Sequence, residues 1–195
     1  MSARRLGMLT PSSNTVVEPT TTNILHGVED VTAHFSRFTV TEISLSEQAL
    51  AQFDIEPFMQ SAELLSHANM DVIAWNGTSA AWRGFHEDVT LCERFAERFH
   101  VKATASMLAL NTILRETGAM RFGLVTPYIN AVQERMIENY HADGFEVVKE
   151  RHSGIKVNFD FSQISEEHIT DMVLDVAQAN PPAIIIVCTN LPSAH

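Results

Sequence analysis

RLGMLTPSSN at residues 5–14 and RFGLVTPYIN at residues 121–130 are two versions of one pattern, Arg-x-Gly-x-x-Thr-Pro-x-x-Asn. A second matched pair follows further along, within DVIAWNGTS (71–79) and AIIIVCTNL (183–191). Matched segments in the same order indicate two half-domains of one design. The second pair sets Thr78 against Thr189 and Gly77 against Cys188. The two copies therefore differ where one has a glycine and the other has a cysteine.

Short apolar segments alternate with longer amphipathic segments along the whole chain. This alternation, together with the repeat, predicts an α/β fold of two halves that are related by a pseudo-twofold axis and built on parallel sheets. We expect the halves to span residues 1–117 and 118–195. The second copy ends just after its Cys-Thr-Asn loop, so we expect the C-terminal half to be incomplete at His195. Strands are expected at 5–11, 31–40, 71–77, 121–127, 145–151 and 183–188, with a short one near 102–106. Helices are expected after Pro19 and at 55–68, 86–99, 107–117, 131–142 and 165–179.

The composition argues against several classes of function. The 195 residues have a net charge of −11, and an acidic chain repels nucleic acid. The longest apolar run, AIIIVC, is too short to span a membrane. The two cysteines have no CxxC spacing and MSARR leads into a strand, so we expect a cytoplasmic protein. The histidines lack His-x-His and HExxH spacing, which argues against a metal site.

Small polar residues follow four of the expected strands. In parallel α/β sheets, ligands bind at the carboxyl ends of the strands, and a pseudo-twofold axis brings these loops face to face. Hydroxyls, amides and free backbone N–H groups, without Lys or Arg, suit a carboxylate or a developing enolate. The expected ligand-contacting residues are Pro11, Ser12, Asn14, Gly77, Thr78, Ser79, Tyr128, Asn158, Thr189 and Asn190. For Asn158 a plain turn residue is the alternative, and for Tyr128 a surface loop.

Cys188 is the reactive side chain of this set. Beside a loop of N–H donors its thiolate can be stabilised, which suits a nucleophile or a proton donor to carbon. The alternative is a buried structural cysteine, because free cysteines are among the most buried residues. Cys92 is spaced with Val89, Phe95 and Phe99 on an expected helix, and we expect it to serve packing.

Several segments resemble the maleate isomerase/arylmalonate decarboxylase family, within the aspartate/glutamate racemase superfamily. TPSSNTVVEP resembles the isomerase form of the first loop, and GTSAAWRG resembles the decarboxylase form of the second. VTPY, VNFDFSQI and VCTNL fit both. The resemblance implies flavodoxin-like halves with the active site between them, and it implies no cofactor. Racemases and maleate isomerases of this kind use two cysteines, one from each half, whereas the decarboxylases have glycine in the first loop.

By this resemblance, Thr78, Ser79 and Tyr128 hold a carboxylate that becomes an enediolate, and Cys188 protonates it. Gly77 stands at the first cysteine position, so we predict decarboxylation of arylmalonate-like small dicarboxylic acids. Ser12 and Asn14 resemble isomerase residues that contact a second carboxylate. The alternatives are therefore a maleate cis–trans isomerase, a racemase of the superfamily, or an inactive relative that only binds dicarboxylates. We expect a small dicarboxylate as the partner. The sequence allows a homo-oligomer but does not determine the oligomeric state.

Overall fold

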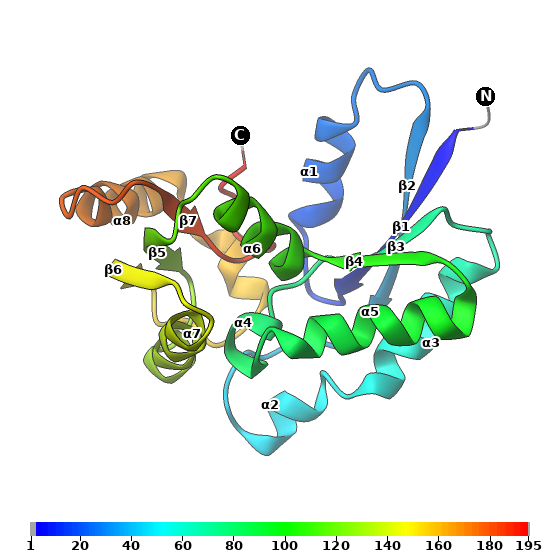
Figure 1. The fold of residues 1–195 in the computed structure, drawn as a ribbon, viewed down its shortest axis with the longest axis horizontal. Coiled ribbons are helices and arrows are strands. Elements are labelled where there is room, and N and C mark those ends of the chain that lie inside the picture. Colours follow the sequence, from blue (N-terminus) through cyan, green and yellow to red (C-terminus); the bar gives the residue numbers. More distant parts are fainter. Residues whose placement is uncertain (1–2, 195) are drawn as a thin grey trace.

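The computed structural model describes residues 3–194 as two parallel sheets with helices around them (Figure 1). The first sheet has four strands in the order β2-β1-β3-β4. The second has three, in the order β6-β5-β7. In each sheet the first strand of the half lies between the second and the third, as the sequence repeat predicts. The first sheet consists of β1 (Arg4–Pro11), β2 (Val31–Phe38), β3 (Val72–Trp75) and β4 (Lys102–Ala105), and the second of β5 (Arg121–Thr126), β6 (Glu146–His152) and β7 (Ile184–Ile186).

The helices agree with the apolar periodicity, and three short ones add to it. Four-residue or five-residue helices are too short to show a periodic pattern, so α2, α4 and the 3-10 helix η1 were not expected. Among residues 3–194, no helix is long and apolar enough to cross a membrane. The helices are α1 (Val17–Ile24), α2 (Glu47–Ala51), α3 (Ile55–Ser66), α4 (Ala80–Arg83), α5 (His86–Phe99), α6 (Ser106–Glu116), α7 (Asn130–Ala142), η1 (Phe159–Gln163) and α8 (Glu166–Ala177).

The parallel α/β architecture predicted from the sequence is confirmed, with small differences at element ends. The strand expected at 183–188 is only Ile184–Ile186, because β7 pairs with β5 alone and over three residues. Gly118 and Gly144 follow α6 and α7 with φ of 72° and 87°, the left-handed conformation expected of helix C-terminal caps.

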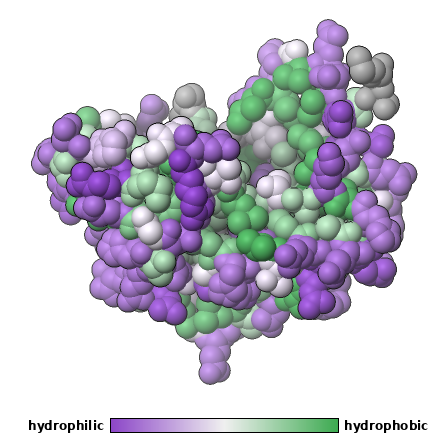
Figure 2. All heavy atoms as spheres, viewed as in Figure 1, coloured by the Kyte–Doolittle hydropathy of each residue, from purple (hydrophilic) through white to green (hydrophobic). Residues whose placement is uncertain are grey.

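The two halves share a core and a short antiparallel contact. Glu42, in the connection between β2 and α2, forms an isolated β-bridge with Val157 of the second half. Beside it, the Ile43 N–H donates to the Lys156 carbonyl at 2.9 Å. One hydrophobic cluster contains both Trp75 and Phe122, so it spans the two sheets. Figure 2 shows the molecule hollowed between its two lobes, with apolar side chains along part of the hollow.

Candidate active site

The loops at the carboxyl ends of the strands meet around one small cavity between the two halves. Strands β1, β3, β5 and β7 all end at this edge of their sheets, which follows from their parallel pairing. The cavity has a volume of about 20 Å³. A space of this size holds about one water molecule. Its walls are Pro11, Val40, Ile43, Phe53, Trp75, Gly77, Thr78, Ser79, Trp82, Tyr128, Asn158, Cys188 and Thr189.

Eight of the residues singled out from the sequence line this cavity, and three do not. Ser12 is exposed, and its hydroxyl accepts the Val40 N–H at 3.2 Å. The Asn14 side-chain oxygen accepts the N–H groups of Val16 and Val17 at the start of α1. Asn190 is buried within the contact between the halves. In this structure these three side chains hydrogen-bond to backbone groups, and their role as ligand contacts stays a prediction.

The hydroxyl cluster of the cavity crosses from one half to the other. The Tyr128 hydroxyl lies 2.7 Å from Thr78 Oγ1, and both residues are buried. The Tyr128 ring packs edge-on against Trp82 and Phe161, with centroids at 5.1 and 5.4 Å. Burial raises the pKa of Tyr128 well above its usual value. The phenol therefore remains protonated and keeps an O–H to donate.

Cys188 presents its thiol to the same cavity, two residues after β7 ends. Part of the residue is solvent-accessible, yet desolvation of the sulfur raises the thiol pKa to about 11. Hydrogen bonds from the Tyr128 hydroxyl and from the Asn190 and Leu191 N–H groups lower it, but by less than burial raises it. These hydrogen bonds act in favour of the thiolate. Burial outweighs them, so the group is a thiol at neutral pH.

Gly77 faces a position that is already filled by aromatic atoms. A Cβ built on Gly77 lies 2.0 Å from Cζ2 of Trp75, a separation that real Cβ atoms do not adopt. Trp75 is almost fully buried, and its indole N–H points to Ser79 Oγ at 3.4 Å. A side chain at position 77 therefore requires Trp75 to move. The packing around residue 77 therefore leaves no room for a cysteine at that position.

A chain of amide and hydroxyl groups fixes the two halves around the cavity. The Asn158 amide donates to Ser13 Oγ at 2.7 Å, and the Asn190 amide donates to the Asn158 carbonyl at 2.6 Å. The Asn14 amide reaches Thr189 Oγ1 at 3.2 Å. The Thr189 hydroxyl in turn donates to the Asn76 carbonyl at 3.1 Å. These side chains set the distance between the strand ends of the two halves.

One wall of the cavity is apolar, and sequence reasoning did not identify it. Val40, Ile43 and Phe53 come from the connection between β2 and α3, and all three are buried. Apolar residues in a connection look like ordinary core residues in a sequence. A group that enters this cavity thus meets hydroxyl and thiol groups on one side and hydrocarbon on the other.

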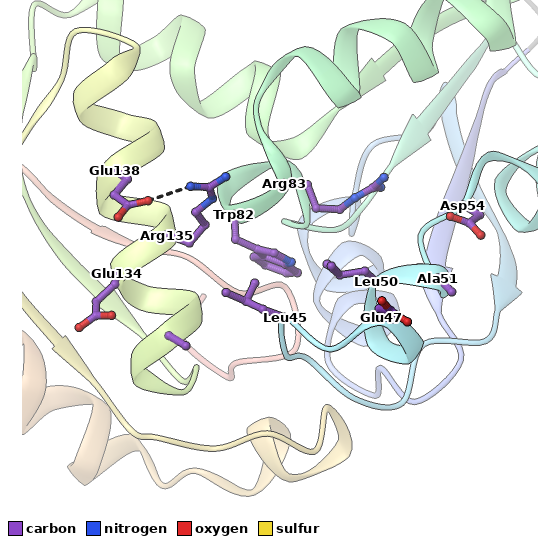
Figure 3. Close-up of a pocket in the computed structure, with 11 residues that line it drawn as sticks. Leu45, Glu47, Leu50, Ala51, Asp54, Trp82, Arg83, Glu134, Arg135 and Glu138 are labelled. Atoms are coloured by element: carbon purple, nitrogen blue, oxygen red, sulfur yellow. Dashed lines mark hydrogen bonds and ion pairs between the residues drawn. The ribbon is translucent and has the colours of Figure 1, made fainter.

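Two larger hollows adjoin the cavity. One of about 310 Å³ lies between α1, α6 and the last described residues, and Thr78, Cys188 and Thr189 belong to its wall as well. The other, of about 780 Å³, lies between α2, α4 and α7, with Trp82 on its wall (Figure 3). This larger pocket carries four acidic residues against two arginines, which disfavours a dianion. Within residues 3–194, no cluster of three or more His, Cys, Asp or Glu side chains is placed to hold a metal ion.

Comparison with known proteins places the chain near two kinds of enzyme. A family model described as "Arylmalonate decarboxylase" matches residues 6–195. The chain is 27% identical over 202 residues to a maleate isomerase from Geobacillus stearothermophilus, covering 97% of this chain and 79% of that protein. It is 26% identical over 209 residues to a maleate isomerase from Alcaligenes faecalis, covering 99% of this chain and 80% of that protein.

Solved structures share the fold. The maleate isomerase Iso from Pseudomonas putida S16, crystallised as a cysteine-to-alanine variant with maleate, superposes with a TM-score of 0.88. It is 24% identical, with 98% of this chain and 80% of that chain covered. A second structure is a liganded arylmalonate decarboxylase variant in which a glycine is changed to cysteine and a cysteine to serine. It superposes with a TM-score of 0.82 and is 20% identical in sequence. There the coverage is 97% of this chain and 79% of the other.

Proposed function

The chain belongs to the arylmalonate decarboxylase family, and on that premise we propose that it turns over a small dicarboxylic acid through an enediolate. Cys188 serves as its single catalytic thiol. The relatives' names, which include both maleate isomerase and arylmalonate decarboxylase, support a dicarboxylate substrate. The cavity supports the intermediate, because its polar wall consists of neutral donors.

The cage for the intermediate is formed by Thr78, Ser79 and Tyr128 with the loop N–H groups. These groups are held in place before substrate arrives, since Tyr128 and Thr78 are already hydrogen-bonded to each other. When the enediolate forms, negative charge moves onto a carboxylate oxygen that these donors face. Each preorganised donor in such a cage contributes about 3–4 kcal/mol to transition-state stabilisation.

Decarboxylation is the reaction that the site itself favours. The bond between the substrate's central carbon and one carboxylate breaks, CO2 leaves, and the electron pair passes into the enediolate. The Cys188 S–H then protonates the central carbon, and solvent returns a proton to the sulfur. The observation that supports this route is that Cys188 and Gly77 line the same cavity, so the cavity contains one thiol and no second. The reaction needs one acid and no base, and the pKa of about 11 keeps Cys188 in the acid form.

Maleate isomerisation is the second candidate, and the comparisons favour it over decarboxylation. Each of the curated relatives described above is a maleate isomerase. In that reaction a Cys188 thiolate adds to one alkene carbon, and the electron pair moves into the adjacent carboxylate to give an enediolate. The former C=C bond, now a single bond, rotates. Loss of the thiolate then restores the double bond and gives fumarate. This route requires the thiolate, which burial disfavours here.

One experiment separates the two reactions. The protein is given phenylmalonate, methylphenylmalonate or maleate, while CO2 is followed by a coupled assay and fumarate by NMR. CO2 from the malonates, without fumarate from maleate, supports decarboxylation, and the reverse result assigns isomerisation. In both cases Cys188→Ala is expected to abolish product formation while still binding malonate by calorimetry. Product formation by that variant at the wild-type rate excludes Cys188 from the chemistry.

A further inference from the structure

A chain of hydrogen bonds links β5, α7 and β6 next to the loop that carries Tyr128 (Figure 1). The Thr126 hydroxyl donates to Gln133 Oε1 at 2.6 Å, and the Gln133 amide donates to Glu150 Oε2 at 2.8 Å. His152 Nδ1 lies 2.9 Å from the same carboxylate oxygen. Thr126 and Gln133 are 0% and 1% exposed. Thr126, Gln133 and Glu150 therefore form a brace between three elements of the second half.

The Glu150 carboxylate fixes the direction of each bond in the brace. A carboxylate accepts hydrogen bonds and has none to donate, so the NH2 group of Gln133 must face it. The amide oxygen of Gln133 then faces Thr126, whose hydroxyl must donate to it. A lone pair on Thr126 Oγ1 is left for the Tyr128 N–H, which points to it at 3.4 Å. The brace thus decides which way the Thr126 hydroxyl turns, and with it the acceptor for Tyr128.

The carbonyl groups of the same loop are held by the segment that follows β6. The N–H groups of residues 153–155 donate to the carbonyls of residues 126–128, at 2.9–3.2 Å. These bonds use the acceptors of the loop backbone, whereas the brace meets its donor, the Tyr128 N–H. Together they fix the backbone from which the Tyr128 ring projects.

The first half repeats the threonine but has an apolar residue in place of the glutamine. Thr10 matches Thr126 in the repeat and is also fully buried, yet its hydroxyl has no hydrogen-bond partner among the described residues. The position that matches Gln133 is Val17, whose side chain cannot accept a hydrogen bond. The half that has the brace is therefore the half whose loop brings a phenol to the cavity.

We propose that Gln133 is a positioning residue, which aims the Tyr128 hydroxyl into the candidate active site through the brace. This role rests on the proposed function, in which Tyr128 belongs to the donor cage. Gln133 is not among the walls of the cavity, so it acts through residues 126–128 and not on the substrate. Misplacing a positioned group by about 1 Å can cost about 100-fold in rate, even when the substitution lies away from the chemistry.

Cys188 reports on the position of the Tyr128 hydroxyl without any assay of turnover. The hydrogen bond from this hydroxyl lowers the pKa of the Cys188 thiol, which burial raises to about 11. Alkylation at about pH 9 follows the thiolate population, so it slows when that hydrogen bond is lost. Iodoacetamide modification is measured by mass spectrometry in a Cys92→Ala background, where Cys188 is the remaining cysteine.

The first test is a double-mutant cycle of Gln133→Leu and Tyr128→Phe. Leucine removes both hydrogen bonds of the Gln133 amide. We expect each single substitution to slow alkylation of Cys188, and Gln133→Leu to lower kcat by up to about 100-fold. In the Tyr128→Phe background Gln133→Leu should change neither rate further, because its effect passes through the phenol hydroxyl. An unchanged alkylation rate in Gln133→Leu, or additive effects of the two substitutions, would overturn the proposal.

Exchanging the amide and the carboxylate gives a second test, in which the brace stays polar. Gln133→Glu alone sets a second group of acceptors against Glu150, so the brace should break and alkylation should slow. Adding Glu150→Gln supplies an amide that donates to the carboxylate at position 133, which accepts from Thr126 as the glutamine does. The double variant should therefore recover the wild-type alkylation rate. A double variant that stays as slow as Gln133→Glu would contradict the role of the brace.

Met136→Ala is the matched control for loss of stability. Met136 lies one turn further along α7 and is fully buried, but it has no part in the brace. The substitution should lower the urea midpoint of unfolding by opening a cavity in the core, and leave the alkylation rate unchanged. Slowing equal to that in Gln133→Leu would mean that any loosening of α7 is sufficient, and would refute the specific role of Gln133.

Alkylation needs no substrate, so these results do not depend on which reaction the protein catalyses. Absence of turnover in the wild type, together with the expected alkylation results, would refute the proposed function and leave the positioning of Tyr128 by Gln133 intact. Turnover in the wild type without any effect of Gln133→Leu on alkylation would do the reverse.

Discussion

The Tyr128 hydroxyl of the second half lies 2.7 Å from Thr78 Oγ1 of the first half, inside the cavity that Cys188 also faces. The two hydroxyls come from loops 50 residues apart in the sequence. Their contact means that neither half alone possesses the complete donor set. The donor cage that we propose for an enediolate therefore needs both sheets in place.

Tyr128→Phe should lower kcat by about 100- to 1000-fold, as loss of one preorganised donor does. The ring stays, so stability should fall by only about 1 kcal/mol, the net value of a typical hydrogen bond. The matched control is Tyr140→Phe. Tyr140 is also fully buried, but its hydroxyl has no partner among the described residues and lies outside the cavity. Turnover and urea unfolding of both variants check this, and equal kcat values would remove Tyr128 from the cage.

Alkylation should show that Cys188 is a thiol at physiological pH. With a pKa of about 11, its thiolate population rises only as the pH approaches 11. At pH 8 its reaction with iodoacetamide should be about 100-fold slower than that of a free cysteine, whose pKa is about 8.5. Mass spectrometry in a Cys92→Ala background isolates the signal. A rate that levels off by pH 7 would instead indicate a stabilised thiolate and favour isomerisation.

Gly77→Ala should destabilise the fold, since its new Cβ meets the Trp75 ring. Overpacking of this kind costs about 1–3 kcal/mol. In a Trp75→Leu background the same change should cost less, because the obstructing ring is gone. Urea unfolding of the four proteins gives a double-mutant cycle, with an expected coupling of about 1 kcal/mol or more. Additive effects would show that Trp75 does not restrict residue 77.

Stability should fall as pH rises from about 4 to about 7, through Asp88. The folded pKa of about 7 lies above the usual value of an aspartate, so the folded state binds the extra proton across this window. This difference in pKa between the folded and unfolded states corresponds to about 4 kcal/mol as an upper value. Asp88→Asn should remove this part of the slope and stabilise the protein above pH 7. Urea unfolding at pH 5 and pH 8 measures the difference, and identical slopes in the two proteins would contradict it.

The sequence predicted the sheets well because two of its strand patterns, those of β1 and β3, recur in β5 and β7. Comparing the copies also led to Gly77 and Cys188, which line one cavity. The sequence could not separate polar residues that face a ligand from those that join the halves. Asn14 and Asn190 have the side chain and strand-end position of a ligand contact, yet they hydrogen-bond across the contact between the halves. That distinction depends on side-chain direction, which a residue type does not encode.

Val40, Ile43 and Phe53 show the opposite difficulty. They form a wall of the cavity, but in the sequence they are apolar residues of a long connection. Nothing in their spacing distinguishes a cavity wall from a core position. Asp88 was likewise unremarkable in the sequence, because an acidic residue in the first turn of a helix is ordinary.

The packing of Gly77 against Trp75 also constrains how this site can change over generations. A lineage that moves from one thiol to two must place a cysteine at position 77, where the indole ring stands. If that substitution comes first, the protein loses stability before it gains any activity that depends on two thiols. A smaller residue at position 75 must therefore be fixed earlier, and it has no catalytic benefit of its own. The order of the two steps is set by sterics, and this ordering works against the appearance of a cysteine at position 77 in descendants of this chain.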